Sequence, residues 1–420
     1  MDEQPPDRTE HVDVVIVGAG PGGGTLANLL ARSGVEVALL ERAGTFEREF
    51  RGFAFQPSAV RILAELDLLD AVRDLEHEEL SSIALEAFGR RYDLLDFDGL
   101  PGPYDYGILM EQPDLLELLF DRAREHGADC RLATTVTDLL VEDDEVVGVV
   151  AHDRDADETV AYRSRVVVGA DGRYSTVREA AGIDAGLFDS ELDVLWFKVD
   201  ADVPLDALGH VTPHGILLSI RLGTSLQLGY VLERGAYPEL KDAGIDTFRD
   251  RLTAMEPRLG DALARDLRRF DDCSLLHIGP GLAPVWVQDG LALLGDAAHV
   301  ASPVGGQGNA LAMQDAAVLH GVLVRALRDR LGREPLPAWV LQPYADRRRP
   351  AVETVLRFQH RAEHVLTWLV RNRERIPLSL QRAGARVLLS VASAKPITGS
   401  LRETLALGPD RVAVEPWLFE

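Results

Sequence analysis

The chain has 420 residues, 46% of them hydrophobic and 27% charged, which is enough for a large core and two or three domains. Its formal charge of −24 at pH 7 would repel phosphate groups, which argues against nucleic acid as a partner. The only cysteines, Cys130 and Cys273, exclude a disulfide framework and a cysteine-based metal site, and we expect no bound metal. Residues 1–11 lack an apolar signal-peptide core, and no stretch approaches the ~20 apolar residues of a membrane helix, so we expect a cytoplasmic protein without an integral membrane segment.

The first predicted elements are a strand, a helix and a second strand over residues 12–42. The apolar run 12–17 leads into the glycine turn Gly18-Ala19-Gly20-Pro21-Gly22-Gly23, and the second apolar run ends in Glu41. Glycines let the backbone bend sharply and approach a pyrophosphate, whose charge a helix N-terminus favours. Glu41 follows Gly23 by 18 residues, close to the spacing of about 20 at which an acid meets a ribose hydroxyl. The pattern predicts a dinucleotide site, because a glycine-rich loop without a ligand would leave Glu41 unexplained.

The later elements predict an α/β fold in which one domain is interrupted by another. Helices are predicted over residues 53–72, 111–127 and 247–267 and from 339 onward, and strands over 132–162 (with an acidic turn at 142–145), 166–168, 190–235 and 290–294. Strands near 12, 35, 132, 166 and 291 are assigned to one Rossmann-like nucleotide-binding domain, with antiparallel strands between them. We therefore expect a discontinuous nucleotide-binding domain (10–80, 107–186, 280–340), an antiparallel-sheet substrate domain (81–106, 187–279) and a C-terminal helical segment (341–420).

Two further glycine-and-acid motifs follow the first. One is Gly169-Ala170-Asp171-Gly172 with Ser175 and Arg178, and the other is Gly295-Asp296 followed by Pro303 and Gly305-Gly306-Gln307-Gly308-Asn309. With these three motifs in this order, the chain resembles the class A flavoprotein monooxygenases from about residue 12 to about residue 350. This group has the fold of para-hydroxybenzoate hydroxylase and includes ubiquinone-pathway and polyketide hydroxylases of secondary metabolism.

The resemblance implies tightly bound FAD and a transient visit by NADH or NADPH. It assigns the pyrophosphate to the glycine turn, the adenosine ribose to Glu41, the ribityl chain to Asp296 and the flavin ring to the loop 305–309. It also implies that Gln112 contacts FAD, that Arg51 lies near the flavin, and that Asp171 serves FAD and nicotinamide binding. The expected cofactor-binding residues are Gly18, Gly20, Gly23, Glu41, Arg42, Arg51, Gln112, Asp171, Asp296, Gly306, Gly308 and Asn309. No catalytic residue is assigned, although Pro303, Gly305 and Gly306 are expected near the flavin and Arg51 is a candidate.

Several of these residues have a structural interpretation as well. Asp296 could cap the segment after it, Asp171 could cap a helix over 175–181, and Arg51 could be a solvated arginine. We interpret His299 as a structural histidine near the flavin rather than a base. The aromatic residues Tyr92, Tyr104, Tyr106, Trp196 and Phe197 could line a pocket, yet aromatics at strand spacing are more often core. A helix beginning at Asn309 would stabilise negative charge on reduced flavin by roughly 0.3–1 kcal/mol, or up to ~2 kcal/mol if partly buried.

The C-terminal segment is basic within an acidic protein. Between Tyr344 and Arg402 there are eleven arginines and one lysine against four acids. One interpretation is a basic surface for an anionic substrate carrier or a membrane. We favour the other, in which a pair of helices packs its apolar side on the acidic body.

By the resemblance, the chain is expected to be a single-component FAD-dependent monooxygenase. Such an enzyme uses NAD(P)H and O2, through a flavin C4a-hydroperoxide, to hydroxylate a phenolic, polycyclic or polyketide-like small molecule. A halogenase is disfavoured, because the chain has no lysine before Lys198 and no Trp-x-Trp-x-x-Pro segment. The alternatives are a flavin oxidoreductase of the geranylgeranyl-reductase type and a flavoprotein that only binds a biosynthetic intermediate. The substrate, the choice of nicotinamide and the oligomeric state (monomer or homodimer) are left open by the sequence.

Overall fold

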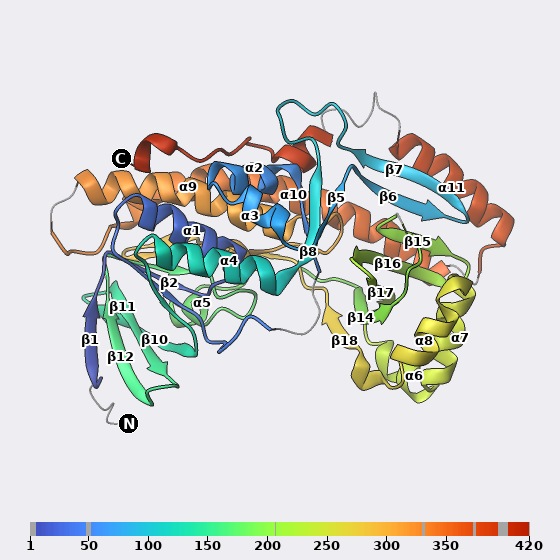
Figure 1. Ribbon diagram of the computed structural model, residues 1–420, viewed down its shortest axis with the longest axis horizontal. Coiled ribbons are helices and arrows are strands. Elements are labelled where there is room, and N and C mark those ends of the chain that lie inside the picture. Colours follow the sequence, from blue (N-terminus) through green and yellow to red (C-terminus); the bar gives the residue numbers. More distant parts are fainter. Residues whose placement is uncertain are drawn as a thin grey trace.

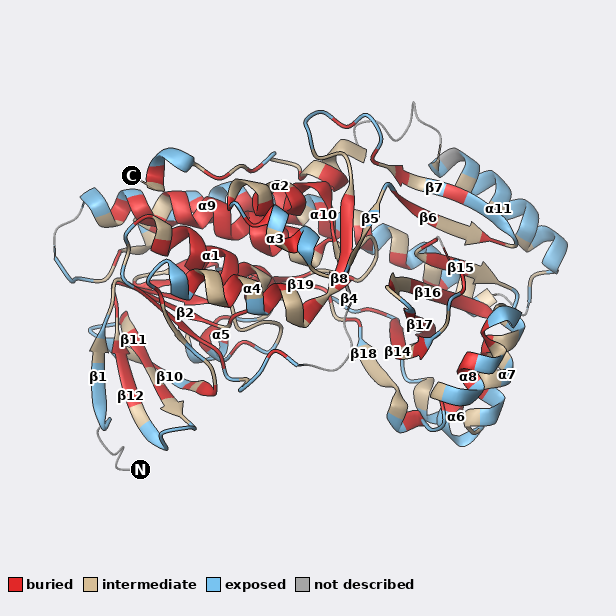
Figure 2. Cartoon of the chain, viewed as in Figure 1, coloured by how far each residue is buried: buried red, intermediate tan, exposed pale blue. Residues whose placement is uncertain are grey.

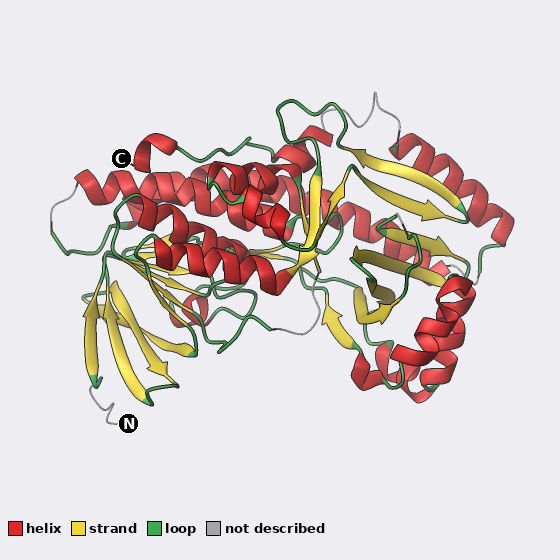
Figure 3. Ribbon diagram, viewed as in Figure 1, coloured by secondary structure: helices red, strands yellow, loops and turns green. Residues whose placement is uncertain are grey.

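The structure is a computed structural model that describes residues 6–47, 52–205, 207–329, 332–372, 375–393 and 402–419. Its parallel sheet with the covering helices lies at one end and a seven-stranded sheet at the other, and the long helix α10 (Ala338–Asn372) runs between them (Figure 1). Helices and strands both contribute to each end (Figure 3). The chain therefore has the expected mixed α/β architecture.

The parallel sheet contains all five strands that the sequence assigned to one domain. Its order is β20-β21-β13-β2-β3-β9, and its strands are β2 (Val14–Val17), β3 (Val37–Leu40), β9 (Asp129–Arg131), β13 (Val166–Gly169), β20 (Val287–Gln288) and β21 (Leu291–Leu293). The pairs of β2 with β3, β2 with β13, β13 with β21 and β3 with β9 are all parallel. Parallel strands covered on both faces are apolar runs rather than alternating patterns, which explains why these segments were recognisable.

Helices α1 (Pro21–Arg32) and α4 (Gln112–Glu125) pack on this sheet, α9 (Gly308–Asp329) packs on α1, and α2 (Pro57–Glu65) packs on α9. The predicted helix over 111–127 is confirmed as Gln112–Glu125, and it is followed by Gly127, whose φ of +100° favours glycine. Helix α9 is long and apolar enough to cross a membrane, contrary to the expectation that no segment approaches this composition. However, 83% of its most apolar window is buried inside the protein, so α9 is a core helix (Figure 2).

The prediction of a single helical stretch over 53–72 was wrong at its start. Residues Gly52–Phe55 form strand β4, which pairs with β8 (Gly107–Glu111) in a three-stranded sheet completed by β5 (His77–Leu80). Helix α2 begins only at Pro57, because the residue before a proline is held in an extended conformation. Helix α3 (Leu69–Asp74) then follows, so the helical part is divided in two.

A four-stranded sheet flanks the parallel sheet. Its order is β1-β12-β11-β10, with β1 (Arg8–His11), β10 (Thr134–Glu142), β11 (Glu145–Asp153) and β12 (Glu158–Arg163). The predicted acidic turn is confirmed: Glu142 pairs with Glu145, and both intervening residues, Asp143 and Asp144, have positive φ, as a two-residue hairpin requires.

The seven-stranded sheet has the order β18-β14-β17-β16-β15-β6-β7 and is mostly antiparallel. Its strands are β6 (Ser82–Ala87), β7 (Arg90–Asp96), β14 (Leu192–Asp200), β15 (Gly209–Thr212), β16 (Gly215–Leu222), β17 (Ser225–Glu233) and β18 (Ser274–His277). One face, with Leu195, Phe197 and Leu228, packs on α7 (Ile245–Met255) and α8 (Gly260–Asp266). The other face, with Val194 and Trp196, meets the second half of α10.

Short elements complete the chain. These are α5 (Thr176–Ala180), α6 (Tyr237–Asp242), β19 (Gly281–Leu282), β22 (His299–Val300), α11 (Leu378–Ala392) and four 3-10 turns (Pro257–Leu259, Phe270–Asp272, Gly295–Ala297, Pro416–Phe419). The division into a discontinuous nucleotide-binding domain, an inserted sheet domain and a C-terminal helical segment stays a prediction.

The two C-terminal helices differ from each other. Helix α10 buries an apolar stripe that includes Val352, Val355 and Leu356 in the main core, as a helix packed on the body should. Helix α11 contacts β6 and β7 but leaves Leu380 and Val387 mostly exposed, at 62% and 66%. The expected packing of a helix pair therefore describes α10 and not α11.

Candidate functional site

The glycine turn of the first motif leaves no room for larger residues except where a ligand would lie. A Cβ at Gly18 would lie 2.5 Å from the Ala170 carbonyl oxygen, and one at Gly23 would lie 2.0 Å from the Gly18 carbonyl oxygen. At Gly20, which directly precedes α1, a Cβ would meet no heavy atom within 4 Å. The turn is thus packed tightly on its inner side and open at the N-terminus of a helix, which is the geometry that accepts a phosphate.

Glu41 is buried beside this turn. Its carboxylate accepts hydrogen bonds from the backbone amides of Ala19 (3.0 Å) and Ala43 (2.8 Å). These two bonds fix the orientation of the carboxylate beside the turn. Arg42 is exposed, and its carbonyl oxygen accepts a bond from Arg154. Arg51 lies outside the described residues.

The second motif is joined to the first and the third. Gly18 packs on Ala170 and Asp171, and Arg178 donates through Nη1 to the Ala297 carbonyl oxygen at 3.0 Å. Asp171 accepts bonds from the Ser175 hydroxyl group and from the Val177 amide (3.1 Å). Burial raises the pKa of Asp171, and these hydrogen bonds oppose that shift. The carboxylate thus supports the start of α5, as the structural interpretation expected, and its role toward a cofactor stays a prediction.

The third motif is held by a buried charge network that the sequence did not indicate. Asp315 on α9 accepts bonds from the Gly295 amide (3.1 Å), from His299 Nε2 (2.6 Å) and from Arg348 Nε (2.7 Å). Arg348 also reaches Asp410 through Nη1 at 2.7 Å. Asp315 and Arg348 have no exposed side-chain surface. Because Asp315 binds residues on both sides of Asp296, it fixes the turn that carries the predicted ribityl-binding carboxylate.

His299 has the surroundings of a structural histidine. It is 1% exposed, donates through Nε2 to Asp315, and lies 5.2 Å from the Trp286 ring, measured between ring centroids. Although burial alone would raise the pKa of Asp315, attraction to His299 and Arg348 outweighs it and holds the pKa below the usual range.

The glycine loop before α9 is fastened from two sides. Gly305 and Gly306 have φ of +78° and +60°, which favours glycine at both positions. Gln56 donates through Nε2 to the Gly305 carbonyl oxygen at 2.8 Å. Gln359 on α10 accepts from the Ser302 amide (3.1 Å) and donates to its carbonyl oxygen (2.9 Å). Pro303, Gly305 and Gly306 on this loop are half-buried, as are Gly308 and Asn309 at the start of α9.

Gln112 lies where the two sheets meet. It is the first residue of α4 and is buried, and Glu111 before it forms an ion pair with Lys198 of β14 at 2.9 Å. This pair joins the seven-stranded sheet to the nucleotide-binding part beside a predicted flavin contact.

The aromatic candidates separate into core and surface-facing residues. Phe197 belongs to the core under α7, and Tyr92 is also buried. Tyr106 is half-buried and accepts a bond from Arg73 at 2.7 Å, and Tyr104 is half-buried as well. Trp196 is half-buried on the opposite face of β14, and its ring covers Gly229, where a Cβ would lie 2.9 Å from Cζ3. Among these residues, Trp196 is the one on the sheet face that meets α10.

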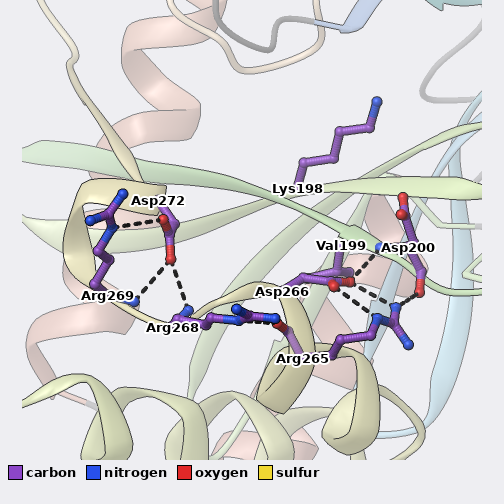
Figure 4. Close-up of a pocket in the computed structure, with 8 residues that line it drawn as sticks. All are labelled: Lys198, Val199, Asp200, Arg265, Asp266, Arg268, Arg269 and Asp272. Carbon is purple, nitrogen blue, oxygen red and sulfur yellow. Dashed lines mark hydrogen bonds and ion pairs between the residues drawn. The ribbon is translucent and has the colours of Figure 1, made fainter.

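An open pocket lies at the C-terminal end of β14. It is lined by Lys198, Val199, Asp200, Arg265, Asp266, Arg268, Arg269 and Asp272 (Figure 4). Arg265 pairs with Asp266 at 2.8 Å and Arg269 with Asp272 at 3.3 Å, so its charges largely compensate one another. Lys198 points away from the other residues (Figure 4) and toward Glu111.

The residues of the three motifs fit a dinucleotide with a flavin at one end. An open helix N-terminus, an oriented buried carboxylate and the half-buried Asp296 follow one another around the ends of β2, β3 and β21. Sequence reasoning missed Asp315, Gln56 and Gln359, which hold these groups from distant parts of the chain. The residues next to them in the sequence do not indicate that role.

Comparisons with known proteins agree with this site. A profile of the family described as "FAD binding domain" matches residues 11–359. A 6-methylpretetramide 4-monooxygenase of Streptomyces rimosus is 37% identical over 424 residues, covering 99% of this chain and 97% of that protein. An aklavinone 12-hydroxylase of Streptomyces peucetius is 30% identical, covering 77% of this chain and 71% of its own length. The solved structure of p-nitrophenol 4-monooxygenase from Pseudomonas putida DLL-E4 shares the fold, with a TM-score of 0.75 and 22% identity over 95% of this chain and 99% of that one.

Proposed function

We propose that the substrate of this chain is an aromatic polycyclic compound of the polyketide type. The chain belongs to the FAD binding domain family and is an FAD-dependent monooxygenase. The reaction consumes NADH or NADPH and O2 and adds one oxygen atom to the substrate. The observation that carries this proposal is the 37% identity to a 6-methylpretetramide 4-monooxygenase across 99% of the chain.

The chain's own residues would hold the cofactor along the carboxyl ends of the parallel strands. Gly18 and Gly20 give the pyrophosphate access to the N-terminus of α1, and Glu41 accepts the ribose hydroxyls. Asp296 binds the ribityl chain on the turn fixed by Asp315. FAD, when bound, supplies the redox chemistry by accepting a hydride and activating dioxygen.

The inner face of the seven-stranded sheet supports an apolar, flat substrate. Trp196, Gly229 and Leu218 lie side by side on β14, β17 and β16, as their backbone register requires. The ring of Trp196 covers the glycine, and Leu218 is half-buried next to it. Fused aromatic rings stack well on such a surface.

The chain's task in catalysis is to exclude water and to orient the substrate toward the loop 302–309. Gln359 and Gln56 bind that loop from α10 and from the residue before α2, which favours one preorganised conformation of the loop.

A substrate screen tests the proposal. FAD-loaded protein is mixed with hydroxylated anthraquinones and tetracyclic aromatic polyketides, and NADH and NADPH oxidation is followed together with product mass. We expect at least one compound to stimulate nicotinamide oxidation and to gain one oxygen atom. Stimulated reduction of a lipid double bond would instead indicate an oxidoreductase, and FAD binding without any stimulated oxidation would indicate a protein that only binds an intermediate.

A further inference from the structure

Helix α10 buries three polar side chains on one face, at every fourth position. Gln359, Glu363 and Thr367 are 1%, 4% and 5% exposed. Residues four apart on a helix share a face, so these groups form a polar row among apolar neighbours. Burying polar groups is costly unless they are partnered, so each should have a reason to be there. Gln359 has one, because it fastens the loop at Ser302 and Val304.

Glu363 is only partly accounted for by the fold. The hydroxyl groups of Ser302 and Ser190 lie beside its carboxyl group and favour its charged form. Its other oxygen, Oε1, is buried and has no hydrogen-bond partner within the described part of the chain. No ion pair with a described cation compensates the carboxylate. A buried carboxyl group with an unsatisfied oxygen needs an explanation, and a ligand that supplies the missing hydrogen bond is one.

The position of Glu363 joins the two halves of the site. Ser302 immediately precedes Pro303 on the loop expected under the flavin, and Ser190 precedes β14, which carries Trp196. One turn further along α10, Leu366 packs against the same sheet face as Trp196. Glu363 therefore lies where the cofactor loop meets the surface proposed for the substrate.

The charges around Glu363 are few. On α10, His360 and His364 are exposed and lower its pKa, while burial, the largest effect, raises it. Arg234, which directly follows β17, donates to the carbonyl oxygen of Ser190 at 3.0 Å. A carboxyl group with a raised pKa is better matched to exchanging a proton with a phenol than a surface glutamate is.

We propose that Glu363 is a catalytic residue that binds a phenolic hydroxyl of the substrate through Oε1 and takes its proton. In this step the phenol O–H bond breaks, a carboxyl O–H bond forms, and the negative charge moves from Glu363 to the substrate oxygen. No oxidant or reductant is needed. The resulting phenolate is more electron-rich, and so more reactive toward an electrophilic oxygen. This inference rests on the proposed function, because it requires an aromatic hydroxyl-bearing ligand at the site.

The test uses FAD-loaded enzyme without nicotinamide, so that no turnover occurs, and emodin, a polycyclic phenol whose visible absorption shifts when it ionises. The charges of Glu363 and of the phenolate repel each other, so in wild type the two groups should titrate as a coupled pair, and the midpoint for ionisation of bound emodin should be at least one pH unit higher than in E363Q. E363D, which keeps the carboxyl group, should recover most of the shift. The matched control E353Q removes a partly exposed glutamate of the same helix, paired with Arg357, and should leave the midpoint unchanged.

A second measurement needs no ligand. The infrared spectrum of wild type should contain a carboxyl band that titrates with pH and is missing from E363Q. Equal emodin midpoints in wild type and E363Q would overturn the proposal, as would the absence of such a band if emodin does not bind. Failure of the proposed function would look different, because then no aromatic compound would stimulate nicotinamide oxidation in wild type, whatever Glu363 does.

Discussion

Replacing Asp315 by asparagine should loosen the turn that carries Asp296. Asp315 is completely buried and holds Arg348 Nε at 2.7 Å, His299 Nε2 at 2.6 Å and the Gly295 amide at 3.1 Å. Removing one partner of a buried ion pair costs about 3–5 kcal/mol. Because Arg348 keeps Asp410 at 2.7 Å, we expect the lower end, a loss of about 3 kcal/mol in the free energy of unfolding.

The same substitution should weaken FAD binding. Losing the hydrogen bond from the Gly295 amide should reduce the free energy that holds the turn in place by about 1–1.5 kcal/mol. A loss of that size in the free energy of FAD binding corresponds to roughly a tenfold rise in the Kd of FAD. Urea unfolding of the apoprotein and quenching of flavin fluorescence measure the two effects separately. D329N, at an exposed position of the same helix, is the matched control. If D315N unfolds like wild type and binds FAD equally well, the network does not position the turn.

The network also sets a dependence on pH. The pKa of Asp315 is lower in the folded protein than its ordinary value, which is about 3.9 when unfolded. Such a group stabilises the fold above that ordinary value, and the stabilisation is lost as pH falls through the folded value. Wild type should therefore lose stability more steeply than D315N below about pH 4.

Three further substitutions test other parts of the site. G18A should lower the free energy of unfolding by more than an unfavourable φ alone would, which is about 1–3 kcal/mol. It should also abolish FAD retention, because the added Cβ would overlap the Ala170 carbonyl oxygen. G34A is the control, because Gly34 also has positive φ but has no atom within 4 Å of a Cβ, so urea unfolding that is equal for both variants would refute the overlap. E41A should release FAD more readily, by about tenfold in Kd if a charged hydrogen bond worth about 1.5 kcal/mol is lost, and unchanged fluorescence titrations would argue against a ribose contact. G308D should lower the two-electron flavin potential by about 5–20 mV, from about 0.3–1 kcal/mol of charge interaction at the helix N-terminus, and an unchanged potential in folded protein would show that α9 does not stabilise the reduced ring.

The sequence predicted those parts of the fold whose signals are local. The glycine turn, the acid after the second strand and the apolar runs at 14–17, 37–40 and 166–169 each lie within a few residues, so their pattern is visible without a structure. The segment at 53–55 was misjudged because a short apolar run fits a helix as well as a strand, and its pairing with β8 depends on residues over fifty positions away.

The residues that hold the site in place could not be predicted in this way. In the sequence, Asp315 is a single acid within an apolar helix, and Gln359 is a single polar residue within a basic helix. Their importance comes from contacts with Gly295 and Ser302, which depend on how α9 and α10 pack. A packed pair of C-terminal helices was also expected, whereas α11 leaves Leu380 and Val387 mostly exposed.

The most direct test of the function is to give the FAD-loaded enzyme NADPH or NADH, an aromatic polyketide that stimulates nicotinamide oxidation, and isotopically labelled dioxygen. The product should carry one labelled oxygen atom for each nicotinamide oxidised in coupled turnover. A product without the label, or protein that stays colourless after incubation with FAD, would contradict the account.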